Sequence, residues 1–221
     1  MDEMMSVPLT ISSMPLPELV QRLDPPAPDY VLDAAKSLRF RSLLTINLLI
    51  DQPQETPDNW LYIHDPSVKV GRIQFFANWS PSMVPDPGKS SMGMEYFCWE
   101  NDPLWSMSDD DLIKMGKNEL SKLGIIDTAH IFDAFVIRMP KSYPLYDNHY
   151  HKHVEVLKKH LEQFSNLHPC GRYGLFKYNN MDHSILTAIY AVENILGAQH
   201  NIWSVNTDDE YYEEAGNVSK E

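Results

Sequence analysis

Residues 171–196 read GRYGLFKYNNMDHSILTAIYAVENIL, and this stretch says most about the fold of the 221-residue chain. Its two glycines lie three residues apart and predict a sharp turn, because glycine adopts backbone conformations that other residues avoid. A helix is expected next, over about 181–196, with Asn179 or Asn180 as its cap and Gly197 after its end. Apolar residues recur in it every three or four positions, so we expect its buried side to be lined by Ile185, Ile189, Val192 and Leu196.

The start of this predicted helix is a candidate site for a negatively charged group. The first amides of a helix have no intrahelical partner, and they carry the positive end of the helix dipole. Arg172 and Lys177 lie just before it, in a chain whose formal net charge is −13. The residues alone leave a second interpretation open, an ordinary turn followed by a capped helix, because every helix has an N-terminus.

The same stretch closely resembles the C-terminal flavin-binding signature of the UDP-galactopyranose mutases. It also resembles their relatives among the flavin amine oxidases and protoporphyrinogen oxidase-like proteins. The positions that carry the resemblance are Gly171-Arg172-x-Gly174, Tyr178-x-Asn180-Met181-Asp182-His183-Ser184 and Ala191-Val192-Glu193-Asn194-Ile195-Leu196. Two further segments are similar to elements of these enzymes and follow the same order, Tyr143-Pro144 and Ile11-Ser12-Ser13-Met14-Pro15-Leu16. Together the similar segments span most of residues 6–205.

The resemblance implies FAD as cofactor and a flavin site on this stretch. It implies that the glycine turn passes near the ribityl chain and pyrophosphate, and that the helix starts beneath the pyrimidine edge of the flavin. A helix N-terminus suits that edge, because reduction places negative charge there. Asp182 would cap the helix or bond a ribityl hydroxyl. The implied cofactor-binding residues are Gly171, Arg172, Gly174, Tyr178, Asn179, Asn180, Met181, Asp182 and His183.

One element of these flavoenzymes has no counterpart in the chain. They begin with a strand, the pattern Gly-x-Gly-x-x-Gly and a helix that together hold the FAD pyrophosphate. None of the nine glycines here has another glycine two residues away, so the pattern is absent. We therefore expect the chain to be the C-terminal portion of such an enzyme. We also expect it to bind FAD weakly or not at all without a separate N-terminal dinucleotide-binding half.

The remaining sequence predicts an α/β or α+β fold with a mostly antiparallel sheet flanked by helices. Aromatic-rich or β-branched runs predict strands over residues 43–50, 60–64, 71–79, 94–99 and 132–139, the last stopped by Pro140. Helices are expected over about 31–38, 108–124 and 150–164. A short strand near the N-terminus should lie beside the glycine turn. The expected domains are a partial FAD-binding domain (1–16 and 165–205), a substrate-binding domain (17–164) and an acidic, disordered tail (206–221).

The aromatic strands predict mainly core packing, but alternation places some side chains on the other face of the sheet, where they could line a substrate cavity. The candidate substrate residues are Arg72, Trp79, Arg138 and Tyr143. Arg138 could instead pair with an acid at the edge of the core. Cys98 lies in an apolar strand, where thiolate formation is disfavoured, so we do not expect it to be a nucleophile.

Composition excludes several other classes of function. The net charge argues against nucleic-acid or anionic membrane partners. No apolar run reaches the length of a membrane span, and the sparse cysteines fit a cytoplasmic protein. His149, His151 and His153 do not converge on one helix face, so no metal site is expected.

The expected activity is hydride transfer from a small substrate, a nucleotide sugar or an amine, to flavin N5. One alternative is a mutase-like reaction without net redox change. Another is a non-catalytic remnant or subunit that binds a partner half.

Overall fold

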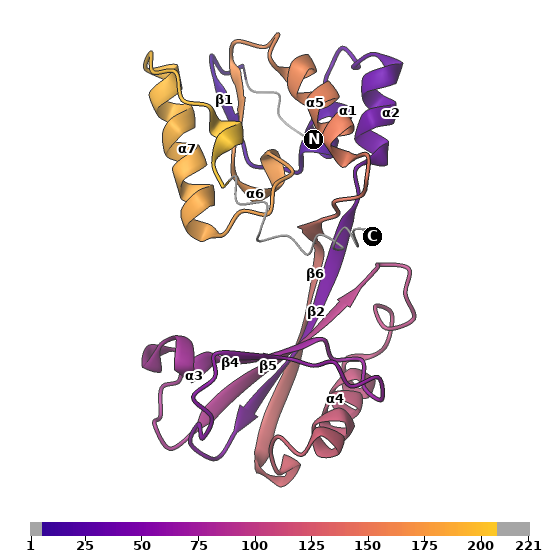
Figure 1. Ribbon diagram of the computed structural model, residues 1–221, viewed down its shortest axis with the longest axis vertical. Coiled ribbons are helices and arrows are strands. Elements are labelled where there is room, and N and C mark those ends of the chain that lie inside the picture. The colour runs from indigo at the N-terminus through magenta and orange to yellow at the C-terminus, as the bar shows by residue number, and fades with distance from the viewer. Residues whose placement is uncertain (1–5, 207–221) are drawn as a thin grey trace, which may run out of the picture. The chain divides into compact units, whose positions relative to one another are not determined.

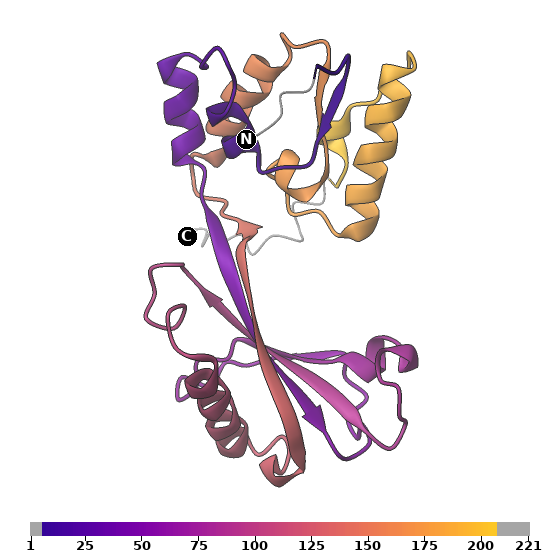
Figure 2. The same ribbon diagram turned by 180° about the vertical axis from the view of Figure 1, so that it is seen from behind.

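The computed structural model describes residues 6–206, which form two compact units (Figures 1 and 2). One unit is Phe40–Tyr143 and is called the sheet unit below. The other combines residues 6–39 with residues 144–206 and is called the helical unit. The acidic segment expected to form a tail lies, from residue 207 onward, outside the described residues.

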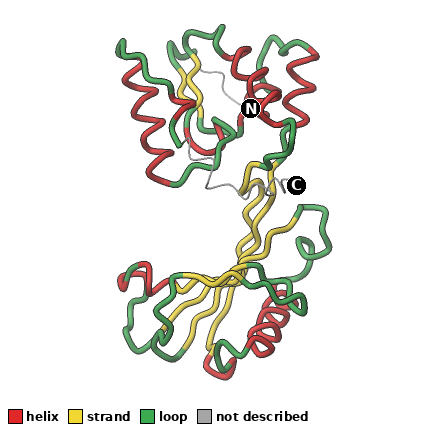
Figure 3. The backbone as a smooth tube through the Cα atoms, in the orientation of Figure 1, coloured by secondary structure: helices red, strands yellow, loops and turns green. Residues whose placement is uncertain are grey.

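The sheet unit is built on five strands in the order β3-β4-β5-β2-β6, drawn yellow in Figure 3. Their bounds are β2 Phe40–Ile50, β3 Trp60–Tyr62, β4 Arg72–Phe75, β5 Ser90–Cys98 and β6 Ile131–Pro144. The pairs β2–β5, β3–β4 and β4–β5 are antiparallel. The expected antiparallel sheet is therefore confirmed, and with it the mixed α/β class.

One face of this sheet is apolar and carries helix α4, Asp109–Leu123. Leu44, Ile46 and Leu48 of β2 are buried there with Met92, Met94 and Tyr96 of β5 and with Leu112 and Leu120 of α4. Gly116 lets the helix approach closely, since a Cβ at this position would lie 3.0 Å from the Ile46 side chain. The helix has the predicted ends. The Ser108 side chain accepts from the Asp111 amide, and Gly124 adopts the left-handed conformation with φ 64°.

Three predicted boundaries in the sheet unit were wrong. Residues expected to end the strand over 71–79 form the short helix α3, Phe76–Trp79, in which Asn78 donates to the carbonyls of Thr56 and Asp58. Strand β5 begins four residues before the expected start. Strand β6 continues through Pro140, because it is an edge strand and needs no outward amide at that position.

The helical unit contains a two-stranded parallel sheet of β1, Thr10–Ser12, and β7, Leu167–Pro169. The N-terminal strand thus lies beside the segment that leads into the glycine turn, as expected. Helices α1, α2 and α5 pack on one another through Leu16, Val20, Val31, Leu157 and Leu161, and their bounds are Leu16–Gln21, Asp29–Ser37 and Tyr150–Leu161. The chain continues through α6, Gly171–Gly174, α7, Met181–Ile195, and the short 3₁₀ helix η3, Ile202–Ser204.

The boundaries between the two units differ from the expected domain limits after residues 16 and 164. Residues 17–39 and 144–164 belong with β1 and α7, because α1, α2 and α5 pack together and α1 also contacts α6. The division of flavin and substrate binding between the units stays a prediction. Among residues 6–206, no helix is long and apolar enough to cross a membrane.

Candidate functional site

The glycine turn holds β1 and α7 together. The Gly171 amide donates to Thr187 Oγ1 of α7 at 2.9 Å, in a buried position, and Gly171 has φ +78°. Gly174 lies against the end of β1, where a Cβ would come within 2.8 Å of the Ser12 carbonyl oxygen. The Cys170 amide donates to that same oxygen at 2.9 Å. Both glycines therefore have a local structural role, one through its backbone conformation and the other through close packing.

Helix α7 begins at an exposed first turn. Asn180 is the N-cap and forms a capping box with His183, whose Nδ1 accepts from the Asn180 amide at 3.3 Å. Asn180, Met181 and Asp182 are exposed, and the Met181 side chain is 84% exposed. As first-turn residues, Met181 and Asp182 have backbone amides without an intrahelical acceptor. These two amides can donate to an anion or to a ring carbonyl.

Asn179 lies directly before this first turn and is 2% exposed. Neither its amide oxygen nor its amide nitrogen has a hydrogen-bond partner among the described residues. A buried polar group without a partner destabilises a fold, and such a group calls for an ordered water or a ligand. The Asn179 side chain can donate one hydrogen bond through its nitrogen and accept another through its oxygen. It therefore matches a ligand that carries an acceptor next to a donor. The pyrimidine edge of a flavin has this pattern, so Asn179 fits the cofactor that the sequence resemblance implies.

The two cations before α7 are engaged within the chain. Arg172 Nη1 donates to the Asn179 carbonyl at 3.0 Å, and its guanidinium lies 4.2 Å from the centroid of the Tyr178 ring. Lys177 Nζ donates to the Trp203 carbonyl at 2.9 Å. The Tyr178 amide donates to the Tyr146 hydroxyl at 2.7 Å. These contacts hold the loop before α7 in place, and Arg172 and Tyr178 contribute to the site by fixing that loop.

The apolar side of α7 is not its buried side, and this expectation was wrong. Ile185, Ile189, Val192 and Leu196 are 61%, 47%, 44% and 82% exposed. The side that packs on the chain carries the small residues Thr187 and Ala191 instead. Small residues were needed there because α7 packs closely on the glycine turn, whereas the spacing of large apolar residues indicated only that they share one side.

A second group of candidate residues lies on the sheet face opposite α4. Strand register brings Arg72 beside Glu95 on one neighbour and beside Tyr62 on the other. Arg72 Nη2 lies 2.6 Å from Glu95 Oε2, and Arg72 Nη1 and Nη2 lie 3.5 and 3.4 Å from the hydroxyls of Tyr62 and Tyr143. The structure therefore brings Arg72 and Tyr143, two of the four predicted substrate residues, into direct contact.

The third predicted residue, Trp79, lies at the edge of the same group. Its ring centroid is 4.9 Å from that of Trp60, and the Arg72 guanidinium lies 5.7 Å from the Trp60 centroid. The two indoles are 44% and 41% exposed. Together with Tyr62 they make an aromatic surface beside a buried ion pair.

The Arg72–Glu95 pair is shielded from water, with side-chain exposures of 15% and 3%. Burial alone would lower the pKa of Arg72, but its hydrogen bond and charge interaction with Glu95 raise that pKa above its ordinary value. Gln74 also donates to Glu95. The guanidinium is therefore always charged, and Glu95 balances its charge. This arrangement suits a residue that positions its neighbours more than one that binds a substrate phosphate.

Arg138 is not part of this group. Its Nη1 lies 2.6 Å from Asp109 Oδ1 in the first turn of α4, and its other nitrogens donate to the carbonyls of Trp105 and Met107 just before that helix. The structure thus places it with an acid at the edge of the core, the second of the two roles considered for it.

Glu95, Tyr62 and Trp60 were missing from the predicted substrate residues. Only strand pairing brings them to Arg72, and the sequence does not state that pairing. An acid alternating with apolar residues in a strand, as Glu95 does between Met94 and Tyr96, is the one signal that could have singled out a buried partner.

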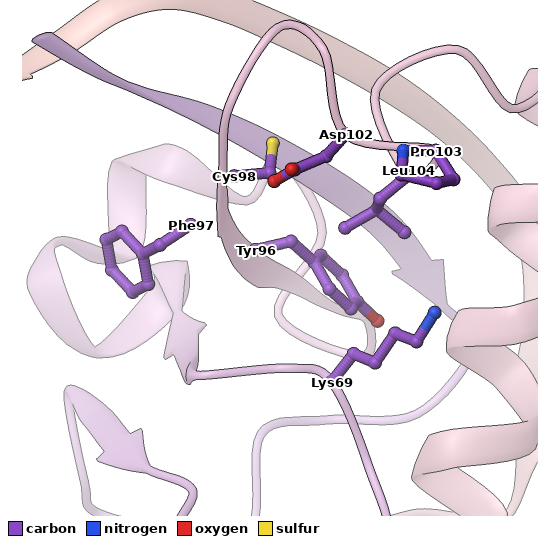
Figure 4. A pocket seen from close by; sticks show the side chains of 7 residues that line it. All are labelled: Lys69, Tyr96, Phe97, Cys98, Asp102, Pro103 and Leu104. Carbon is purple, nitrogen blue, oxygen red and sulfur yellow. The ribbon is translucent and has the colours of Figure 1, made fainter.

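A further hollow of about 360 Å³ lies beside the buried Tyr96 and Cys98 (Figure 4). Burial, and next the charge of Asp102, raise the pKa of the Cys98 thiol. Tyr96 donates to Glu119 at 3.0 Å, and Glu119 also accepts from the amides of Lys69 and Val70. The thiol is poorly suited to act as a nucleophile, in line with its position in an apolar strand. Among residues 6–206, no group of three metal-ligating side chains converges.

No family model matches the chain, and no curated protein matches it. Solved structures do. A reduced UDP-galactopyranose mutase has a TM-score of 0.78 at 19% identity, covering 93% of this chain and 45% of that one. A candidate protoporphyrinogen oxidase from Exiguobacterium sp. 255-15 has a TM-score of 0.61 at 20% identity, covering 84% and 41%. The PF1083 protein from Pyrococcus furiosus has a TM-score of 0.53 at 12% identity, covering 91% and 44%.

The chain thus spans less than half the length of each of these structures. At these identities the likeness concerns the fold. Two of the three carry names from the enzyme groups whose flavin-binding signature residues 171–196 resemble. The chain therefore has the fold of one part of a UDP-galactopyranose mutase and of a candidate protoporphyrinogen oxidase, as its sequence predicted.

Proposed function

We propose that the chain is the C-terminal portion of an FAD-dependent enzyme and that the start of α7 holds the flavin ring. The observation that carries this proposal is the buried, unpartnered amide of Asn179 directly before the exposed first turn of a 15-residue helix. This pair of features falls within the stretch that resembles the flavin-binding signature. The sequence resemblance and the local geometry therefore support the same site.

In this proposal the chain supplies hydrogen-bond donors and a dipole. The amides of Met181 and Asp182 and the positive end of α7 stabilise negative charge on a bound ring. Asn179 pairs with the ring edge, after its side chain turns outward from its buried position. The Asp182 side chain is 77% exposed, so water screens its negative charge. Bound FAD would supply the atom that accepts a hydride from the substrate.

The substrate is proposed to bind the aromatic face of the sheet unit. Tyr62 is 53% exposed and its oxygen faces the Arg72 guanidinium, so its own proton can be donated to a ligand oxygen. Trp60 and Trp79 offer ring faces beside it. A small molecule with a polar oxygen and a flat or apolar portion fits this surface. Nucleotide sugars and amines both remain within that class.

A mutase-like reaction without net redox change is the second candidate. The sequence Asn180-Met181-Asp182-His183-Ser184 favours it, since this segment resembles the signature as it occurs in the mutases. The two reactions differ in one observable. Under anaerobic conditions, hydride transfer from the substrate bleaches the flavin absorbance, whereas a mutase converts its substrate with the flavin already reduced and leaves it so.

Flavin binding is tested by equilibrium dialysis of FAD against the full chain, alone and with a co-expressed dinucleotide-binding half. We expect weak binding by the chain alone and tight binding by the pair. Asn179→Ala should lower the affinity at least about tenfold, as expected for loss of a buried bond to a ligand. Asn118→Ala, on an exposed position of α4, is the matched control. Equal FAD binding by wild type and Asn179→Ala would contradict the role of Asn179. Absence of FAD binding even with the partner half would leave the third possibility, a non-catalytic subunit or remnant.

A further inference from the structure

Strand β6 combines an open backbone edge with exposed apolar side chains. It is the last strand in the order of its sheet, and among residues 6–206 no strand pairs with its outer side. Phe135, Ile137 and Met139 alternate along it and are 46%, 43% and 43% exposed. A long edge strand with exposed apolar side chains is a template for pairing with another strand. The edge of β6 is therefore a candidate surface for such pairing.

The exposed apolar residues of β6 lie on the sheet face opposite α4. Their neighbours Ala134 and Val136 pack on the core that α4 covers, and successive side chains of a strand point to opposite faces. A shift of β6 by one residue would bury the exposed set only by exposing Ala134 and Val136. Rearrangement within the strand therefore does not cover these side chains.

The backbone of β6 offers hydrogen-bonding groups along its open edge. The Lys141 amide points inward, toward β2, where it donates to Ser42 Oγ at 3.2 Å. Successive amides of a strand point to opposite edges, so the amides of Val136 and Arg138 point outward. Pro140 belongs to the same outward set, and the row of outward donors ends before it. The open part of the edge is thus centred on Ile137.

The sequence of β6 is complementary to itself when it is read antiparallel about Ile137. This register places Ile137 opposite the same residue of a second copy and Phe135 opposite Met139. It also places Asp133 opposite Lys141, and both of these side chains are exposed. A register about Phe135 would instead place the Asp133 charge opposite Ile137. Opposite charges and apolar pairs across two strands both favour pairing, so the register about Ile137 is selected.

We propose that β6 pairs antiparallel with β6 of a second copy of this chain, about a two-fold axis at Ile137, and joins the two sheets into one. Val136 and Arg138 exchange backbone hydrogen bonds across the axis. The apolar side chains of the two copies cover one another on the face opposite α4. A two-fold contact of this kind is closed, so assembly ends at a dimer. The dimer depends on the sheet unit alone and requires no flavin.

Disulfide trapping in the full chain tests the register. Ile137→Cys places two thiols at the axis, where directly opposite Cα atoms lie about 4.5–5.5 Å apart and a disulfide can form. Met139→Cys is the matched control, because it is equally exposed on the same face but its two copies would lie about 14 Å apart. The wild-type cysteines are buried and should not crosslink.

We expect mild oxidation to give a covalent dimer with Ile137→Cys and none with Met139→Cys or the wild type. Met139→Cys mixed with Phe135→Cys should form a crosslink between the two variants. Equal crosslinking of Ile137→Cys and Met139→Cys, or none with Ile137→Cys, overturns the proposal.

Sedimentation equilibrium of the uncrosslinked full chain tests the charge pairing. The wild type should form a dimer as its concentration rises. Asp133→Lys places a lysine opposite Lys141 at both ends of the interface and should weaken the dimer about fivefold or more. Adding Lys141→Asp to that variant exchanges the two charges and should restore the wild-type affinity. Tyr30→Lys, at a position 68% exposed in the helical unit, is the control and should leave the dimer unchanged.

Three results of the sedimentation experiment overturn the proposal. They are a wild-type chain that stays monomeric, a dimer that Asp133→Lys leaves intact, and a double variant that dimerises no better than Asp133→Lys alone. The second result would assign dimerisation to another surface. The proposed flavin site is tested separately, because none of these variants lies in the helical unit except the control.

Discussion

Arg72 Nη2 and Glu95 Oε2 lie 2.6 Å apart on the sheet face opposite α4, and both side chains are largely buried. Arg138 and Asp109 are separated by the same distance at the start of α4, but their side chains are 27% and 56% exposed. The two pairs thus share a geometry and differ in their access to water. Burial decides how much each pair matters, because an unpaired buried charge is strongly destabilising whereas an exposed ion pair adds little.

Glu95→Gln should lower the free energy of unfolding of the sheet unit by about 3 kcal/mol, since it leaves the Arg72 charge without its counter-ion. Asp109→Asn should lower it by about 1 kcal/mol or less. Urea unfolding followed by tryptophan fluorescence measures both. Four of the five tryptophans, at positions 60, 79, 99 and 105, belong to the sheet unit and report on it. Equal effects of the two substitutions would contradict the burial argument.

Tyr96 should make the sheet unit less stable in alkaline solution. Its pKa is raised by burial first and then by the Glu119 carboxylate, so the folded state keeps the phenol neutral. A group with a raised folded-state pKa contributes its full stability below its unfolded-state pKa of about 10 and loses it as pH rises further. Urea unfolding at pH 8 to 11 should therefore show a decline above pH 10 of about 1.4 kcal/mol per pH unit.

Tyr96→Phe is the control for this decline. It should lower stability at pH 8 by about 2 kcal/mol, because Glu119 loses a hydrogen bond to a buried hydroxyl. It should also flatten the dependence above pH 10. A variant that declines as steeply as the wild type would assign the alkaline effect to another group.

Gly174→Ala should destabilise the segment between β1 and α7. The added Cβ would lie 2.8 Å from the Ser12 carbonyl oxygen, and backbone has to move to relieve the contact. We expect a loss of about 1–3 kcal/mol in local stability. Hydrogen exchange of residues 167–187, followed by mass spectrometry, measures it. Gly88→Ala is the matched control, since its new Cβ meets only the Asp86 side chain at 3.2 Å. Unchanged exchange in Gly174→Ala would show that β1 and α6 pack less closely.

Asn179→Leu should leave the flavin-free chain at least as stable as the wild type. The asparagine amide is buried without a partner, and an apolar side chain of similar volume removes that penalty, with a gain of up to about 1 kcal/mol. Exchange protection of residues 171–195 provides the readout. Marked destabilisation by leucine would mean that the amide has a structural partner and is not reserved for a ligand.

Features set by local chemistry were predictable from the sequence. Ser108 and Gly124 bound α4 as expected, because a cap and a left-handed residue act within one turn of the helix. The turn at Gly171 and the helix from Met181 followed from the same kind of signal. Family resemblance predicted that the N-terminal strand lies beside the glycine turn, which no local pattern contains. The parallel pairing of β1 with β7 was not predicted.

Features set by long-range packing were not predictable in this way. The side of α7 that faces the chain depends on how closely the glycine turn approaches Thr187, which spacing does not reveal. The pairing of Arg72 with Glu95 depends on strand register between β4 and β5. The passage of β6 through Pro140 depends on its edge position. The first two features depend on contacts between residues far apart in sequence. The third depends on the place of β6 at the edge of the sheet.

The central claim, that the start of α7 holds a flavin ring, is tested most directly by nuclear magnetic resonance. FAD is titrated to millimolar concentration into the ¹⁵N-labelled full chain, so that weak binding without a partner half is still detected. We predict concentration-dependent shifts of the Met181 and Asp182 amides and of the Asn179 side-chain amide, and their loss in Asn179→Ala. Shifts confined to other parts of the chain, or none at all, would contradict the account.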